Sequence, residues 1–337
     1  MRISIFGAGA TGGHLAVRLS QQGHEVSVLA RGAHLNAIRA DGLSLLQGDT
    51  TSTAHVRASD NAADLGRQDL VVVTVKATGL ATAASQMAPL IGPDTLVVFP
   101  QNGMTWWYPI GLPAGHPPVP GIPIFSLAPR FLALMRPDQV VPGIVYSANE
   151  VLSPGVIRNN SPSKNALEIG WLDPRASEPV DQLRRTLQAA GIASAPVTDM
   201  RAAVWLKLIG NASASSLSVA TGNPSSIATD PAIREVFLRL VNECLAVAQA
   251  YGYPLAGRLD LARWGQHRSQ HKPSLLQDYE QGRAMELGEM VLAPVAFARA
   301  AGLATPTLDA VAAIAARLAA DRGLYAPVAA GEPAANG

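Results

Sequence analysis

The apolar positions of the first 200 residues gather in short continuous runs instead of alternating with polar ones. Such runs, rich in Val and Ile, are typical of parallel strands that are buried on both faces. Segments of helical composition separate them, at residues 12–22, 32–40 and 78–91. The pattern predicts a doubly wound α/β sheet, whose first strands are residues 2–6 (RISIF), 25–29 (EVSVL), 69–75 (DLVVVTV) and 95–99 (TLVVF).

Later segments extend this domain and then change character. Strand-like runs recur at 143–148, 155–160 and 166–170, and a helix is expected near 179–190. After about residue 199 the pattern is helical without a convincing strand, and Pro294 is expected to break or kink the third of four long stretches: 201–218, 230–252, 274–301 and 307–321. We therefore predict a Rossmann domain at 1–198, an all-helical domain at 199–325, and a disordered tail at 326–337.

A Pro/Gly-rich segment interrupts the first domain at residues 109–123 (PIGLPAGHPPVPGIP). It cannot form a regular helix or a central strand, so we expect a loop or a lid. Trp106, Trp107 and Tyr108 lead into it. These aromatic side chains either line a ligand-binding cleft, where they would select a bulkier or more aromatic ligand, or pack against the domain surface.

The composition excludes several classes of protein. The chain has 337 residues and a formal net charge of +1, without the basic block that nucleic-acid or acidic-membrane partners require. Its one cysteine, Cys244, lies in an apolar helical stretch, which indicates a buried small residue and a reducing compartment. The N-terminus does not resemble a secretory signal, and no apolar run reaches the roughly 18 residues of a membrane span. We expect a soluble, cytoplasmic protein.

A glycine motif follows the first strand directly. Residues 7–12 read GAGATG and open a helix, which is the context in which G-x-G-x-x-G binds a dinucleotide. The first glycine permits the tight turn, the second lets the backbone approach the pyrophosphate, and the third lets the helix pack close to the strand. We expect all six residues of the turn to bind the cofactor: Gly7, Ala8, Gly9, Ala10, Thr11 and Gly12.

The residue after the second strand indicates which dinucleotide binds. An NAD site has an acid there, whereas this chain has Arg31, whose guanidinium suits the 2′-phosphate of NADP; a solvated surface arginine is the alternative. Two further polar residues follow strands, where open α/β sheets bind ligands. Lys76 faces either phosphate or water, and Asn102 either orients a nicotinamide or forms a turn with Gly103.

A lysine lies within the apolar stretch AVWLKLIGNASASS. A buried ammonium must reach solvent, pair with a carboxylate, or act in chemistry. On an α-helix Lys207, Asn211 and Ser215 share one face, because residues four apart are neighbours. Further on, Ser274 lies in SLLQD, and Glu286 opens a helix between Met285 and Leu287, where it offers the carboxylate that a buried lysine needs.

Together these motifs resemble the ketopantoate reductase family (2-dehydropantoate 2-reductase), from Met1 to about residue 320. The glycine turn, VTVKA, QNG, WxKxxxN, SxLQD and MEL occur in the family's order. The resemblance implies a Rossmann domain, a helical domain, an active site in the cleft between them, and NADPH-dependent reduction of a 2-oxo acid. By motif position, Lys207 takes the place of the catalytic lysine, Glu286 of its partner, and Asn102 of the asparagine beside nicotinamide and lysine. Asn211 and Ser274 fall at substrate contacts, whereas Ser215 stands where the family has an asparagine.

Three functions stay open at this level. The first is ketopantoate reduction, with Lys207 as general acid. The second is reduction of a different 2-oxo acid, because the hydroxyl of Ser215 cannot make an amide's contacts. The third is a non-catalytic NADP(H)-binding protein on the same scaffold. We expect no metal site, since His267 and His271 have no evident third ligand, and a homodimer is compatible with the sequence.

Overall fold

The computed structural model describes residues 1–259 and 272–326 of the chain. The chain divides into two compact units. Unit 1 consists of Met1–Gln101 and Leu127–Met200, and unit 2 of Asn102–Ser126 and the residues from Arg201 onward. The predicted domains meet between residues 198 and 199, close to the last of these crossings, but the prediction assigns 102–126 to the first domain. His267, His271 and residues 327–337 of the predicted tail lie outside the described residues.

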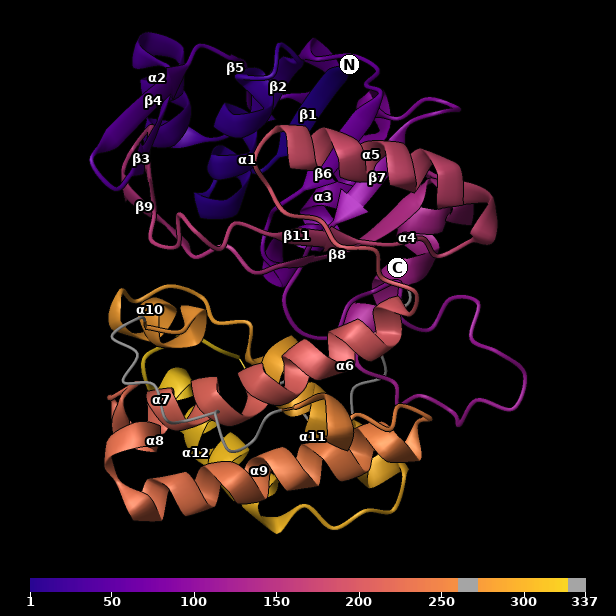
Figure 1. The fold of residues 1–337 in the computed structure, drawn as a ribbon, viewed down its shortest axis with the longest axis vertical. Coiled ribbons are helices and arrows are strands. Elements are labelled where there is room, and N and C mark those ends of the chain that lie inside the picture. Colours follow the sequence, from indigo (N-terminus) through magenta and orange to yellow (C-terminus); the bar gives the residue numbers. More distant parts are fainter. Residues whose placement is uncertain (260–271, 327–337) are drawn as a thin grey trace. The chain divides into compact units, whose positions relative to one another are not determined.

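Unit 1 is built on a seven-stranded sheet with the order β11-β8-β7-β6-β1-β2-β5 (Figure 1). Neighbouring strands are parallel throughout, except that β11 runs antiparallel to β8. The chain places β2 on one side of β1 and β6 on the other, so the strand order reverses at β1, where ligands of such sheets bind. The strands are β1 (Arg2–Phe6), β2 (Glu25–Leu29), β5 (Arg57–Ser59), β6 (Leu70–Val73), β7 (Leu96–Phe99), β8 (Val140–Val145) and β11 (Leu167–Ile169).

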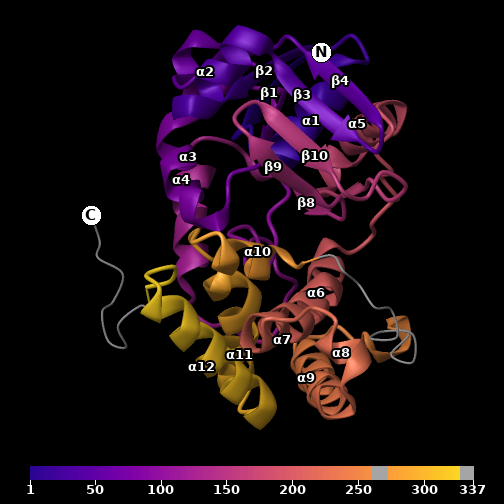
Figure 2. The ribbon, with the colours of Figure 1, turned by 90° about the vertical axis from the view of Figure 1, so that its left-hand side faces the viewer.

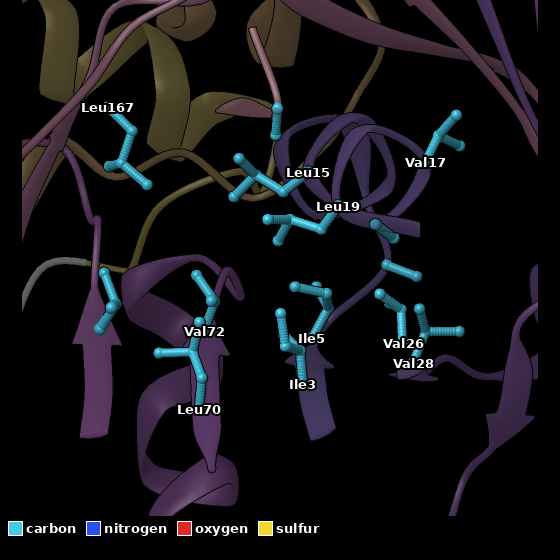
Figure 3. Packing of buried hydrophobic residues seen from close by; sticks show 14 of the residues in the cluster. Ile3, Ile5, Leu15, Val17, Leu19, Val26, Val28, Leu70, Val72 and Leu167 are labelled. Carbon is cyan, nitrogen blue, oxygen red and sulfur yellow. The ribbon is translucent and has the colours of Figure 1, made fainter. Parts of the chain in front are cut away.

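Helices cover this sheet because each buries one apolar face against it. Leu15 and Leu19 of α1 point toward Ile3 and Ile5 of β1 (Figure 3), and all four side chains are buried. The helix predicted at 78–91 is shorter than expected, since only its centre is α-helical and 3₁₀ turns flank it. The helices of this unit are α1 (Ala10–Ser20), α2 (Gly32–Asp41), α3 (Leu80–Gln86), α4 (Ala128–Leu132) and α5 (Ser177–Ala189).

A second, four-stranded sheet belongs to the same unit and was not foreseen from the sequence. Its order is β4-β3-β10-β9, and β3 pairs with β10 in parallel although more than 100 residues separate them. Helix α1 contacts all four strands, as well as β1 and β2 of the main sheet (Figure 2). The predicted strand at 155–160 therefore lies in this small sheet. Its strands are β3 (Leu43–Gln47), β4 (Thr50–Ala54), β9 (Asn149–Ser153) and β10 (Val156–Asn159).

From Arg201 onward the described part of unit 2 is helical, whereas residues 102–126 form turns and loops that end in a 3₁₀ turn at Pro123–Leu127. The predicted helix at 201–218 is interrupted by a π-helical turn at Asn211–Ser215, and a second π-helical turn, Gly288–Leu292, precedes α11. The predicted helix at 274–301 is broken at residues 281–286, before Pro294, and Pro294 itself lies in the first turn of α11, directly after the second π-helical turn. The helices are α6 (Met200–Gly210), α7 (Ser216–Thr221), α8 (Ser226–Thr229), α9 (Pro231–Ala250), α10 (Ser274–Glu280), α11 (Ala293–Ala300) and α12 (Pro306–Asp321).

The aromatic segment explains why residues 102–126 belong to unit 2. The side chains of Trp106, Trp107 and Tyr108 are all 0% exposed. The indole N–H of Trp205 donates a hydrogen bond of 2.8 Å to the hydroxyl of Tyr108, whose ring packs edge-on against Phe297 with 5.7 Å between the centroids. Burying such large rings is strongly favourable. Of the two interpretations left open by the sequence, the structure supports packing.

Cys244 is buried, and desolvation raises the pKa of its thiol to about 12, so it stays protonated as a small core residue. Within residues 1–259 and 272–326, no helix has both the length and the apolarity needed to cross a membrane.

Candidate active site

A pocket of about 270 Å³ opens in unit 1 at the carboxyl ends of the parallel strands. Its walls come from the turn after β1, the ends of β2 and β5, and the segment from β6 into α3. This is the edge at which doubly wound sheets bind their ligands. The polar or turn-forming residues that line it are Gly7, Ala8, Gly9, Arg31, His34, Asp60, Gly79, Thr82 and Gln86.

Three glycines give the turn its shape, each for a different reason. Gly7 has a φ of +104°, which a side chain would strain. A Cβ on Gly12 would lie 2.1 Å from the carbonyl oxygen of Gly7, so only glycine lets α1 start this close to β1. A Cβ on Gly9 would meet no protein atom within 4 Å. The space beside Gly9 therefore belongs to the pocket, as the approach of a pyrophosphate requires.

The carbonyl groups of the turn all point to protein partners. The hydroxyl of Thr74 donates to the carbonyl of Gly7 at 2.6 Å, and a ring nitrogen of His34 contacts the carbonyl of Ala8 at 2.6 Å. The carbonyl of Gly9 accepts from the N–H of Gly13 at 2.7 Å. The first N–H groups of a helix have no intrahelical partner, so they are the groups left to face an anion. The turn thus fits a dinucleotide phosphate.

Arg31 lines the same pocket directly after β2, at the position where an NAD site has an acid. Its guanidinium donates a hydrogen bond of 2.8 Å to the amide oxygen of Gln86, a neutral partner that leaves the positive charge uncompensated by that contact. Asp60, after the short strand β5, adds a carboxylate to the same lining. Sequence reasoning missed Asp60, His34, Thr82 and Gln86, because they reach the pocket from elements that carry no motif.

Some residues expected at the cofactor do not line this pocket. Ala10, Thr11 and Gly12 form the first turn of α1 beneath it, and Lys76 precedes a 3₁₀ turn without appearing among the lining residues. Asn102 belongs to unit 2. Their contacts with a cofactor stay predictions.

The second cluster lies within unit 2 and centres on Lys207. Its ammonium donates a hydrogen bond of 2.6 Å to the side-chain oxygen of Asn102, although 105 residues separate the two. Lys207 is half-buried near the end of α6, so its position is fixed while part of the side chain remains accessible. The pairing of the QNG asparagine with the lysine of WxKxxxN is therefore present within one unit.

The backbone after Asn102 connects this lysine to a second acidic segment. The N–H of Met104 donates to the carbonyl of Glu289 at 2.9 Å. Gly103, with a φ of +81°, lies so close that a Cβ would be 2.6 Å from that carbonyl oxygen. Glu289 lies in the π-helical turn that begins two residues after Glu286. Residues 102–104 thus contact both Lys207 and the turn that follows Glu286.

Glu286 is 6% exposed and directly precedes the helical segment that it was expected to open. A carboxylate so deep in a protein is stable only with polar or charged partners. Burial also raises the pKa of Glu289, one turn further along. Ser274, in contrast, is exposed at the start of α10.

The predicted stripe of Lys207, Asn211 and Ser215 needs correction. It assumed one continuous α-helix, but the π-helical turn at Asn211–Ser215 has i→i+5 hydrogen bonds, so Asn211 and Ser215 no longer share one face, whereas Lys207 lies in the α-helical segment before this turn. Ser215 is 3% exposed. The side-chain nitrogen of Asn211 is buried and has no hydrogen-bond partner among the described residues. This turn contacts the one at Gly288–Leu292, and such turns are frequent at functional sites.

The parallel sheet, the glycine turn after β1 and the pocket beside it define a Rossmann-type dinucleotide-binding protein. Comparison with known proteins supports this class and gives the family. The model of the family "Ketopantoate reductase PanE/ApbA" matches residues 3–119, and that of its C-terminal domain matches residues 199–319. The 2-dehydropantoate 2-reductase of Mesorhizobium japonicum is 38% identical over 331 residues, which cover 96% of this chain and all of that protein.

Solved structures lead to the same conclusion. A protein of Ralstonia solanacearum MolK2 superimposes with a TM-score of 0.83 at 32% identity, covering 96% of this chain and 99% of the other. The PanE/ApbA family ketopantoate reductase of Ralstonia eutropha JMP134 gives 0.79 at 26% identity, covering 96% and 100%. The chain belongs to the ketopantoate reductase family, whose members are oxidoreductases that use NADPH.

Proposed function

We propose that this protein reduces 2-dehydropantoate to pantoate with NADPH and that Lys207 is the general acid. The observation that carries the assignment of roles is the 2.6 Å hydrogen bond from Lys207 to Asn102, which holds an ammonium in a defined, partly accessible position. The relative from Mesorhizobium japonicum, named 2-dehydropantoate 2-reductase and matched over its whole length, supports the reaction.

In this proposal, bound NADPH supplies a hydride to the carbonyl carbon of the substrate. The ammonium of Lys207 stabilises the negative charge that develops on the carbonyl oxygen and then donates its proton there. Asn102 restricts the ammonium to one direction, because its oxygen occupies one of the three donor sites of Lys207. Glu286 is the proposed carboxylate of the cluster and favours the charged lysine. Asn211 supplies a free amide N–H for the substrate.

The cofactor assignment concerns unit 1. Residues 7–9 bind the pyrophosphate, and Arg31 binds the 2′-phosphate by charge-assisted hydrogen bonds. We expect Arg31→Gln to weaken NADPH binding at least tenfold and to change NADH binding little, because only NADPH carries the 2′-phosphate. Titration calorimetry with both nucleotides measures this. Equal losses for the two nucleotides would contradict the role of Arg31.

The general acid is tested with Lys207→Ala, using Lys164→Ala as the matched control, since Lys164 is an exposed lysine of unit 1. We expect the first variant to lose 10²–10⁴-fold in kcat while it still binds NADPH, as is typical when a general acid is removed. The control should keep its rate. A Lys207→Ala enzyme that is folded, binds NADPH and turns over at the wild-type rate would refute the assignment.

A second candidate function is the reduction of a different 2-oxo acid. The observation that favours it is the burial of Ser215, at the position where the family has a substrate-binding asparagine. Absorbance assays with 2-dehydropantoate and a panel of other 2-oxo acids separate the two functions. A kcat/KM for 2-dehydropantoate no higher than for the panel would favour the second. Absence of turnover with every 2-oxo acid would instead indicate a non-catalytic NADP(H)-binding protein.

The remaining substrate contact, Ser274, and the predicted homodimer and cytoplasmic location stay proposals. The exposed hydroxyl of Ser274 is accessible to a ligand, and Ser274→Ala should raise KM for the 2-oxo acid more than it lowers kcat. Sedimentation velocity reports the oligomeric state directly.

A further inference from the structure

His34 lies at the pocket in unit 1 but belongs to no sequence motif considered above. It sits in the first turn of α2, half-buried. One ring nitrogen, Nε2, is 2.6 Å from the carbonyl oxygen of Ala8 in the glycine turn. The other, Nδ1, accepts the backbone N–H of Gly155 at 3.0 Å. His34 therefore connects the glycine turn with the bend between β9 and β10 of the small sheet.

These two partners determine the protonation of the ring. The N–H of Gly155 can only donate, so Nδ1 must carry a lone pair. The carbonyl of Ala8 can only accept, so Nε2 must carry the hydrogen. His34 is thus a neutral imidazole with its proton on Nε2, and both nitrogens are engaged by the protein. It has no ring nitrogen left for a ligand and must act through the groups it holds.

The Ala8 carbonyl that His34 holds determines the direction of the Gly9 N–H in the pocket lining. All peptide bonds described here are trans, and in a trans peptide the C=O and the N–H point in opposite directions. Fixing the carbonyl of Ala8 toward His34 therefore turns the N–H of Gly9 away from His34. The N–H of Ala8 is held as well, by the carbonyl of Leu29 at 3.0 Å. That N–H belongs to the preceding Gly7–Ala8 peptide, so the peptides on both sides of the Ala8 Cα are held by protein partners.

The same contact also changes the electrostatics of the phosphate site. A carbonyl oxygen turned into the pocket would repel a pyrophosphate, whereas N–H groups attract it. Thr74 and the first turn of α1 hold the carbonyls of Gly7 and Gly9. The carbonyl of Ala8, between them, depends on His34.

We propose that His34 is a positioning residue for the cofactor: its neutral Nε2–H tautomer keeps the Ala8 carbonyl out of the pyrophosphate site and aligns the Gly9 amide. The proposal rests on the proposed NADPH-binding function. It concerns the pyrophosphate half of the cofactor, which NADPH and NADH share, and it is therefore separate from the role of Arg31.

The test compares His34→Leu and His34→Gln with the wild type, and uses Asn36→Ala, an exposed change on the same helix, as the control. Leucine fills the space without a donor or acceptor, whereas glutamine supplies one of each. In titration calorimetry we expect His34→Leu to raise the Kd for NADPH about tenfold, the weight of a well-placed hydrogen bond. His34→Gln should recover part of the loss, and Asn36→Ala should bind as the wild type does.

Two further measurements distinguish positioning from a general structural role. The KM for NADPH should rise in His34→Leu with kcat little changed, because the contact is made equally in the ground and transition states. In ¹⁵N-histidine NMR of the ligand-free wild type, His34 should show a proton on Nε2 and none on Nδ1.

The proposal is wrong if His34→Leu binds NADPH within twofold of the wild type, if His34→Gln is no better than His34→Leu, or if the proton is found on Nδ1. Failure of the proposed function looks different. If the chain does not bind NADPH, the wild type itself gives no binding signal, and if it binds NADPH without being a reductase, turnover is absent while the binding comparison stands; in both cases the NMR assignment of the His34 tautomer is unaffected.

Discussion

The buried imidazole of His14 should make unit 1 less stable at low pH. It lies in α1 and is only 1% exposed, and its Nε2 has no hydrogen-bond partner among the described residues. Desolvation, with a smaller contribution from the positive charge of Arg18, lowers the pKa of His14 from 6.5 to about 4. Unfolding returns the imidazole to water and to its ordinary pKa.

The sign and size of the effect follow from linkage. Above pH 7.5 the ring is neutral in both states and contributes nothing to the pH dependence. As the pH falls below 6.5, the unfolded state binds a proton that the folded state refuses, so stability is lost until the pH reaches about 4. At about 1.4 kcal/mol per unit of pKa difference, the total loss is about 3 kcal/mol, of which about 2 kcal/mol is already present at pH 5.

Urea unfolding followed by circular dichroism, at several values between pH 7.5 and 4.5, measures this for the wild type, His14→Gln and His14→Leu. Each variant has its own stability at pH 7.5, so only the change with pH is compared. Both variants should lose about 2 kcal/mol less than the wild type between pH 7.5 and pH 5. If all three proteins lose stability in parallel, His14 is not a buried neutral histidine with a depressed pKa.

Three other predictions follow from single contacts. Gly9→Ala should leave stability unchanged within about 0.5 kcal/mol but weaken NADPH binding, since its Cβ enters only the pocket. Gly12→Ala should destabilise unit 1, because its Cβ would overlap the carbonyl of Gly7. Thermal melts and calorimetry separate the two effects. Glu243 of α9 accepts two backbone N–H groups at the start of α12, at 3.0 and 2.7 Å, so Glu243→Ala should cost about 1–2 kcal/mol of unfolding free energy. Tyr108→Phe should cost about 1–3 kcal/mol in the same assay, because it leaves a buried indole N–H without its partner. Unchanged melting of the last two variants would refute these estimates.

Much of the fold was readable from local sequence. The predicted strands at 2–6 and 25–29 coincide with β1 and β2, and those at 69–75 and 95–99 contain β6 and β7. Continuous apolar runs indicate parallel strands that are buried because helices cover both faces of the sheet. The small sheet was missed because β3 (LSLLQ) mixes polar and apolar residues and β4 (TTSTA) has almost no apolar side chain, so neither strand forms a continuous apolar run.

The candidate site was readable only in part. The glycine turn and Arg31 follow strands, so their place at the edge of the sheet was predictable from neighbouring residues. His34 and Asp60 carry no motif, and their place in the pocket depends on how α2 and β5 pack. The predicted α-helical spacing from Asn211 to Ser215 was wrong for a local reason: periodicity does not distinguish an α-helix from a helix with one π-helical turn.

The sequence by itself thus determined the order of the strands along the chain, the dinucleotide turn, and the family to which the chain belongs. These depend on short-range chemistry: β-branched runs, glycines that permit a tight turn, and motifs in a fixed order. The family resemblance implied that Asn102 lies beside Lys207, and the structure gives that contact as a hydrogen bond. Only the tertiary structure decided that residues 102–126 belong with the helical unit and that His34 holds the glycine turn. Such contacts join residues that are far apart in sequence, so they depend on how whole elements pack and leave no periodic signal in the sequence.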